Sequence, residues 1–121
     1  MTARAHGRRV VFVADDLGVS PGIDDGIAAA AAAGNVHEAS LCVTGASVAG
    51  GIRLANEQGI GIGLHLSLTL GQALSGPIRG LTDRAGRFRS LPRVLVACTA
   101  RAVDRDAIER EIGRASCRER V

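Results

Sequence analysis

The sequence contains no Trp, no Tyr and only two Phe in 121 residues, and every one of its 15 basic residues is Arg rather than Lys. An all-arginine basic set is typical of codon usage in a GC-rich genome. The arginines are scattered and mostly alternate with acidic residues, and the formal net charge is only +3. Such a distribution lacks the clustered basic surface that binds a phosphate backbone, so we expect no nucleic-acid partner.

Cysteines and long apolar runs are also scarce. Cys42, Cys98 and Cys117 show neither metal-binding spacing nor an even disulfide framework, which favours reduced thiols. No apolar run is long enough to span a membrane, and Met1–Arg9 is basic without a signal-peptide core. With 46% hydrophobic residues, the chain is predicted to be one globular, cytoplasmic domain.

The stretch from Val10 to Gly18 combines apolar and acidic residues in an informative order. Five apolar residues, 10–14, predict a strand buried on both faces, as in a parallel sheet covered by helices. Asp15 and Asp16 follow at its carboxyl end, where functional groups gather in such folds. A carboxylate pair at this place can equally cap the next helix or remain solvated. Metal hydrolases, phosphoaspartate receivers and haloacid-dehalogenase-like phosphatases also place aspartates there.

A second informative pattern lies in residues 60–69. Ile and Leu alternate strictly with Gly, His, Ser and Thr, which predicts a strand with one aliphatic and one small, polar face. His65 lies on the polar face, and in a barrel it would approach the same mouth as the two aspartates. A lone histidine in a strand is usually structural, but the neighbouring glycines and the polar face favour a metal ligand.

The remaining pattern alternates strands and helices. We predict helices over 20–33, 46–58, 91–102 and 104–111, strands over 36–44 and 60–69, and a loop over 71–90. Asp24 lies in the first turn of a predicted helix, which favours a capping or dipole role over a place in the site. His37 falls at the amino end of its strand, opposite the aspartates, and is predicted to be a surface or structural residue.

Several motifs together resemble one family. They are Ala14-Asp-Asp-Leu-Gly-Val-Ser20, Gly26-Ile27, Ala39-Ser-Leu-Cys-Val43, Gly63-Leu-His-Leu-Ser-Leu-Thr69, Leu81-Thr-Asp-Arg-Ala-Gly-Arg-Phe88 and Ile108-Glu-Arg-Glu111. In order and spacing they resemble the YdjC-like (ChbG/HpnK) carbohydrate deacetylases, over residues 8 to 111. The chain departs from the family pattern at Leu17, where Phe is common, and at Asp24, where Asn is common.

The resemblance implies an α/β, (β/α) barrel-like fold and a metal-dependent hydrolase. Such enzymes remove acetyl groups from N-acetylated sugars, of the chito-oligosaccharide or hopanoid-linked type. By resemblance, Asp15 is the catalytic base, and Asp16 and His65 are two ligands of a divalent ion, Mg or Zn. The implied partner is an N-acetylated sugar or oligosaccharide; the residues that bind it are not identified by sequence.

The length points to a truncated barrel. A complete (β/α)₈ barrel needs roughly 250 residues, and the family's further histidine ligand has no counterpart here. Residues 111–121 leave the family pattern and resemble a translated sequencing adapter. We therefore expect a partial deacetylase domain over 1–110, a non-native tail over 111–121, and little or no activity. The alternatives are an Asp-Asp phosphatase or phosphoaspartate domain, and a non-catalytic pseudoenzyme or interaction module, including a homo-oligomer that completes its sheet with a partner.

Overall fold

Three short parallel strands form the only sheet within the part of the chain that the structure describes. The computed structural model describes residues 10–118. Strands β1 (Val13–Leu17), β2 (Glu38–Leu41) and β3 (Gly61–Leu64) lie in the order β1-β2-β3. All pairs are parallel, so the three carboxyl ends meet at one edge. The predicted α/β class is therefore correct.

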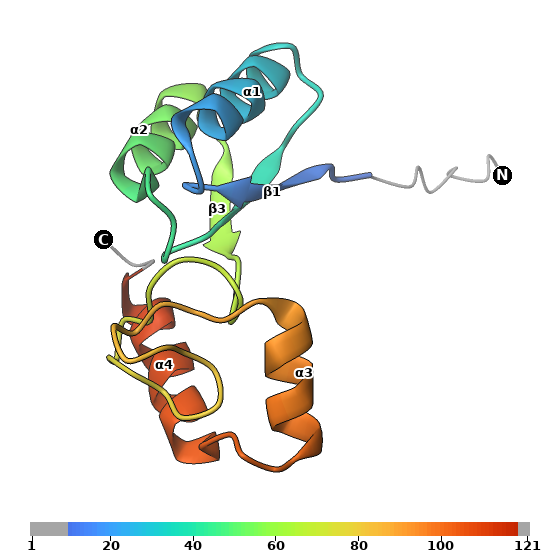
Figure 1. Ribbon diagram of the computed structural model, residues 1–121. Helices are drawn as coiled ribbons and strands as arrows, with labels where there is room; N and C mark the ends of the chain where they lie inside the picture. Colours follow the sequence, from blue (N-terminus) through green and yellow to red (C-terminus); the bar gives the residue numbers. More distant parts are fainter. Residues whose placement is uncertain (1–9, 119–121) are drawn as a thin grey trace, which may run out of the picture.

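Two helices connect these strands and cover the sheet. Helix α1 (Pro21–Ala32) follows β1, and helix α2 (Val48–Gln58) follows β2. They pack against each other and lie on the same side of the sheet (Figure 1). Pro21 begins α1, where proline needs no hydrogen-bond partner, and Gly59 ends α2 in the left-handed conformation with φ 66°. These local signals are why both helices lie close to the predicted ranges.

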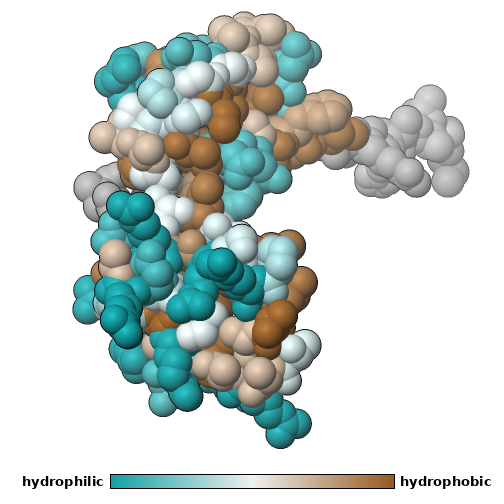
Figure 2. All heavy atoms as spheres, in the orientation of Figure 1, coloured by the Kyte–Doolittle hydropathy of each residue, from teal (hydrophilic) through white to brown (hydrophobic). Residues whose placement is uncertain are grey.

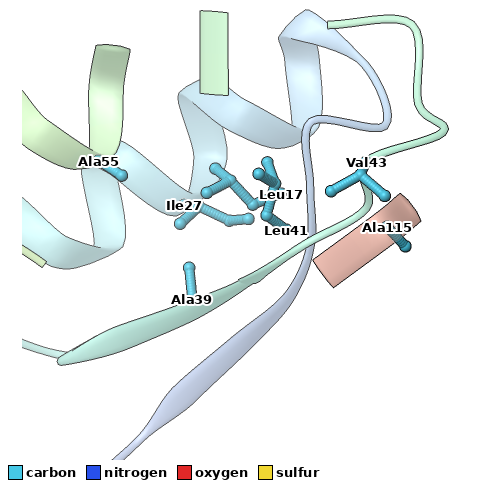
Figure 3. Packing of buried hydrophobic residues seen from close by; sticks show 7 residues of the cluster. All are labelled: Leu17, Ile27, Ala39, Leu41, Val43, Ala55 and Ala115. Atoms are coloured by element: carbon cyan, nitrogen blue, oxygen red, sulfur yellow. The ribbon is translucent and has the colours of Figure 1, made fainter. Parts of the chain in front are cut away.

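The main hydrophobic core lies between this sheet and its helices. Figure 3 shows its seven buried members, which are Leu17, Ile27, Ala39, Leu41, Val43, Ala55 and Ala115. The aliphatic side chains predicted to share one face of β3, Ile60, Ile62 and Leu64, pack against this cluster. Leu66, predicted for the same face, is 46% exposed, because β3 ends at Leu64 and the alternation ends with it.

The second half of the chain builds a separate lobe below the sheet (Figure 1). It contains helices α3 (Leu91–Thr99) and α4 (Arg105–Arg118) and a long loop before them. Loop and helices share a second core, formed by Ala73, Ile78, Leu81, Val94 and Ala107. Asp104 caps α4, since its Oδ1 accepts the backbone N–H of Ala107 at 3.1 Å.

Helix α4 continues without a break past residue 110. Glu111 is 2% exposed, and Ala115 is 3% exposed and belongs to the main core. The carboxylate of Glu111 accepts the backbone N–H groups of Leu74 and Ser75, both at 2.7 Å, and the Ser75 hydroxyl at 2.6 Å. These bonds join α4 to the long loop. The assignment of 111–121 as a non-native tail stays a prediction.

The expectation that residues 10–14 form a strand buried on both faces is wrong. The strand begins at Val13, and Val10, Val11, Phe12 and Val13 are 50–66% exposed. The physical reason is position: β1 is an edge strand of the described sheet, and its amino end extends beyond the helices. Figure 2 shows this apolar strip at the amino end of β1. The burial of β1 is confined to its carboxyl end, at Leu17.

Candidate active site at the strand ends

An irregularity in β1 turns two consecutive aspartates toward one side. Ala14 pairs with Ala39 and Leu17 with Leu41, so β1 contains one more residue than β2 between these points. Asp16 adopts φ 68°, in the left-handed region that residues other than glycine rarely occupy. In a regular strand Asp15 and Asp16 would point to opposite faces. The bulge removes that constraint.

His65 approaches both carboxylates from the end of β3. Its backbone N–H donates to the carbonyl oxygen of Leu41 at 2.9 Å, which extends the ladder one residue past the strand. The imidazole Nδ1 lies 3.8 Å from Asp15 Oδ1, and Nε2 lies 3.6 Å from Asp16 Oδ1. The structure therefore brings together all three residues that the sequence singled out for chemistry.

Ser40 is a member of this cluster that the sequence analysis missed. Its Oγ lies 2.7 Å from Asp15 Oδ1 and 2.9 Å from His65 Nδ1, so it connects the two. The signal for it was the alternation in β2. Ala39 and Leu41 are buried on the core side, which directs Ser40 to the opposite, polar face.

The cluster is open to solvent on its acidic side. The side chains of Asp15 and Asp16 are 72% and 54% exposed, whereas that of His65 is 28% exposed. Oxygen and imidazole nitrogen are both ligands of divalent ions such as Zn. Two ligand atoms bound to one such ion at ordinary distances lie roughly 3–3.5 Å apart. The 3.6 Å between Asp16 Oδ1 and His65 Nε2 lies just above this range.

Asp16 and His65 do not make a complete metal centre. Within residues 10–118, no three His, Cys, Asp or Glu side chains gather around one possible metal position. His37, as predicted, lies away from the cluster at the amino end of β2. There its Nδ1 accepts the backbone N–H of Phe12 at 3.1 Å, and its ring stacks on Phe12.

Asp24 supports the site without joining it. Its carboxylate is 1% exposed and accepts the backbone N–H of Gly18 and the hydroxyl of Ser47, each at 2.6 Å. These bonds tie the turn after β1 to the residue that precedes α2. Asp24 lies outside the cluster, in agreement with the prediction. It does not cap its own helix, however, and its carboxylate joins these two loops instead.

A hollow of about 450 Å³ is formed by loops at the carboxyl ends of the strands. Its walls come from the turn after β1, the loop after β2 and the long loop after β3. Polar groups are supplied by Thr44, Gln72 and Arg87, and the apolar lining includes Val19 and Leu70. The hollow thus lies at the same edge of the sheet as the carboxylates and contains no aromatic side chain.

In this chain, two carboxylates and an imidazole lie at the carboxyl edge of a parallel sheet. This places the chain in the class of α/β proteins whose polar site is assembled from the ends of successive strands. Comparison with known proteins specifies the family. The family model described as YdjC-like protein matches residues 9–114, and this chain belongs to that family.

Proteins similar in sequence to this chain are described as carbohydrate deacetylases. The chain is 36% identical over 105 residues to carbohydrate deacetylase 1 of Listeria innocua serovar 6a, and 34% identical over 107 residues to a carbohydrate deacetylase of Brevibacillus brevis. These alignments cover 86% and 88% of this chain but 42% and 43% of the relatives. The chain therefore spans less than half the length of the curated relatives it matches.

The fold is also similar to a solved structure. A protein of Enterococcus faecalis V583, described as a cellobiose-phosphate cleavage protein, superimposes with a TM-score of 0.67 at 25% sequence identity. The superposition covers 84% of this chain and 39% of that one. The α/β arrangement of this chain thus corresponds to part of a larger fold.

None of the helices in residues 10–118 combines the length and apolar composition needed to cross a bilayer.

Proposed function

We propose that this chain carries part of the active site of a metal-dependent carbohydrate deacetylase that removes acetyl groups from N-acetylated sugars. The observation that carries the proposal is the convergence of Asp15, Asp16 and His65, with carboxylate-to-imidazole distances of 3.6–3.8 Å. The names of the relatives supply the reaction class, and they favour it over the Asp-Asp phosphatase alternative. The sugar is of the chito-oligosaccharide or hopanoid-linked type.

In this proposal the three side chains have separate tasks. Asp16 and His65 would hold a divalent ion, Mg or Zn, and the chemistry it would supply there is polarisation of the acetyl carbonyl and stabilisation of negative charge on its oxygen. Asp15 takes the proton of the attacking water as general base. Oδ1 of Asp15 accepts the Ser40 hydroxyl at 2.7 Å, which orients the carboxylate and leaves its second oxygen to receive that proton.

The hollow of about 450 Å³ is the proposed place for the sugar. Its polar groups suit a substrate rich in hydroxyl groups: Thr44 offers a hydroxyl, Gln72 an amide and Arg87 a guanidinium. Sugar sites often stack rings on aromatic side chains, and this hollow has none. We therefore assign it hydrogen-bonding recognition of one sugar unit.

The chain is proposed to be the N-terminal portion of a (β/α) barrel. Strand order follows chain order, and both connecting helices lie on one side of the sheet, as in a barrel. The relatives are more than twice as long as the region they share with this chain. Because residues 10–118 supply only two candidate ligands, we expect the 121-residue chain alone to bind metal weakly and to have little or no activity.

Metal titration tests this proposal directly. Calorimetric titration of the full 121-residue chain with Zn²⁺, and separately with Mg²⁺, is expected to show weak binding. That binding should fall at least tenfold in Asp16→Asn and in His65→Gln, because the first replaces a charged carboxylate ligand by a neutral amide and the second removes the imidazole ligand. His37→Gln is the matched control, since His37 lies at the other end of the sheet, and it should bind like the parent chain.

Two results would contradict the proposal. If Asp16→Asn and His65→Gln bind metal as well as the parent, the proposed ligands are wrong. If the purified 121-residue chain releases acetate from N,N′-diacetylchitobiose with robust, metal-dependent turnover, the expectation of a catalytically incomplete chain is wrong.

A further inference from the structure

The hydroxyl of Ser40 lies between two groups that make opposite demands on its single proton. Its Oγ is 2.7 Å from Asp15 Oδ1 and 2.9 Å from His65 Nδ1, and both distances are those of hydrogen bonds. A carboxylate has only acceptor oxygens, whereas a ring nitrogen of neutral imidazole is either a donor or an acceptor. The position of the hydroxyl proton therefore determines the state of the ring.

Only one arrangement satisfies both bonds. If Ser40 donated to His65 Nδ1, the hydroxyl oxygen would face Asp15 Oδ1 at 2.7 Å with no proton between two electron-rich atoms. If Ser40 donates to Asp15, its lone pair is free to accept a proton from Nδ1. His65 must then carry its proton on Nδ1, and a neutral ring leaves Nε2 with an exposed lone pair.

That lone pair is directed at the proposed metal position. Nε2 lies 3.6 Å from Asp16 Oδ1, whereas Nδ1 faces Ser40 and Asp15. Asp15 does not fix the ring directly, since its Oδ1 is 3.8 Å from Nδ1, beyond hydrogen-bond distance. Ser40 is therefore the group that can set the tautomer.

The backbone explains why a residue of β2 can do this. Ser40 pairs with Gly63 across the sheet, and Gly63 and His65 lie on the same face two residues apart. The space beside Gly63 is open, since a Cβ there would meet no other atom within 4 Å, so it is the strand register that brings the hydroxyl to the imidazole. We infer that Ser40 is a positioning residue: through the Asp15–Ser40–His65 chain it holds His65 in the Nδ1–H tautomer and presents Nε2, unprotonated, beside Asp16. The metal-binding part of this inference rests on the proposed function; the tautomer does not.

Nitrogen-15 NMR of the metal-free 121-residue chain detects the tautomer without any need for activity. At about pH 8, where histidine side chains are ordinarily neutral, we expect a protonated-type shift for His65 Nδ1 and an unprotonated-type shift for Nε2. His65→Gln assigns these signals by removing them. His37 is an internal reference of the opposite kind, because its Nδ1 accepts a backbone N–H and the proton must lie on Nε2.

Variants at residue 40 test whether Ser40 determines the tautomer of His65. Ser40→Ala should return His65 toward the Nε2–H form that free histidine favours in water, and should weaken Zn²⁺ binding roughly 10- to 100-fold, as is usual when a group orienting a metal ligand is lost. Ser40→Thr keeps the hydroxyl and suits a strand, so it should retain both the Nδ1–H tautomer of His65 and the Zn²⁺ binding of the parent chain. Ser90→Ala is the matched control, because the Ser90 hydroxyl makes no capping bond.

The outcomes separate this inference from the proposed function. An Nε2–H signal for His65 in the parent chain, or an Nδ1–H signal retained in Ser40→Ala with a native circular dichroism spectrum, would overturn the inference and leave the deacetylase proposal standing. A second outcome combines two results: His65 carries its proton on Nδ1 and loses that preference in Ser40→Ala, while metal binding is unchanged in Asp16→Asn and His65→Gln. This outcome would support the inferred tautomer and overturn the proposed function.

Discussion

Two regions of the molecule use carboxylates in opposite ways. At the strand ends, Asp15 and Asp16 are largely exposed, and they have oxygens left over for other partners. Behind the strand ends, Asp24 and Glu111 are 1% and 2% exposed, and Asp24 accepts two hydrogen bonds while Glu111 accepts three.

The difference follows from the cost of burying charge. A buried carboxylate is tolerated only where hydrogen bonds replace water, so its acceptor capacity is used within the fold. Asp24 and Glu111 each join two segments that are distant in the sequence, and this fixes the loops around the hollow. The exposed pair keeps capacity for a metal ion or a proton. Burial thus separates structural acids from the candidate reactive ones.

The largest effect on stability is expected at Asp24. Asp24→Ala leaves the buried N–H of Gly18 and the hydroxyl of Ser47 without their acceptor, which should lower the free energy of unfolding by about 3 kcal/mol. Asp25→Ala, at the exposed neighbouring position, should change it by less than about 0.5 kcal/mol. Urea denaturation followed by circular dichroism measures both, and equal effects would contradict the structural role of Asp24.

A somewhat smaller loss is expected at Glu111. Its bonds to Leu74 and Ser75 are only partly buried, so water can replace part of what is lost. Glu111→Ala should cost about 2 kcal/mol. Glu109→Ala removes the same charge from an exposed position of α4 and should be near neutral. Hydrogen exchange adds a local reading: the amides of residues 74 and 75 should lose protection only in the Glu111 variant.

At Asp16 a substitution is expected to raise the free energy of unfolding rather than lower it. Its φ of 68° is strained for aspartate and natural for glycine, so Asp16→Gly should raise the free energy of unfolding by roughly 1 kcal/mol while weakening metal binding. Asp16→Asn tolerates the same backbone and should leave stability nearly unchanged with the same loss of binding. Thermal denaturation and Zn²⁺ titration on the same samples test this, and a strongly destabilised Asp16→Gly would show that the backbone is not strained.

The smallest effect is expected in the exposed apolar segment that precedes β1. Val11 is 50% exposed, so Val11→Thr should change stability by less than about 0.5 kcal/mol. The same substitution at Val43, which is 3% exposed, puts a hydroxyl into the main core and should cost about 2 kcal/mol. Urea denaturation compares the two, and a large loss at Val11 would mean that this segment is covered in solution.

Much of the fold could be predicted because local signals agree with the final structure. Pro21 and Gly59 mark helix ends, and Asp104 caps α4. The alternation around His65 identified which face of β3 meets the core as far as Leu64. The strand before the aspartates was harder, since an apolar run indicates a strand but cannot show whether neighbours cover it.

What the sequence by itself determined is the order of strands and helices, the family, and the three residues to examine first: Asp15, Asp16 and His65. These depend on periodicity and on motifs of adjacent residues, which are properties of the chain alone. Only the tertiary structure decided how they meet, because the bulge at Asp16, the pairing that places Ser40 against Asp15 and His65, and the burial of Asp24 depend on segments far apart in the sequence. Contacts of that kind are set by strand register and packing, and no local pattern encodes them.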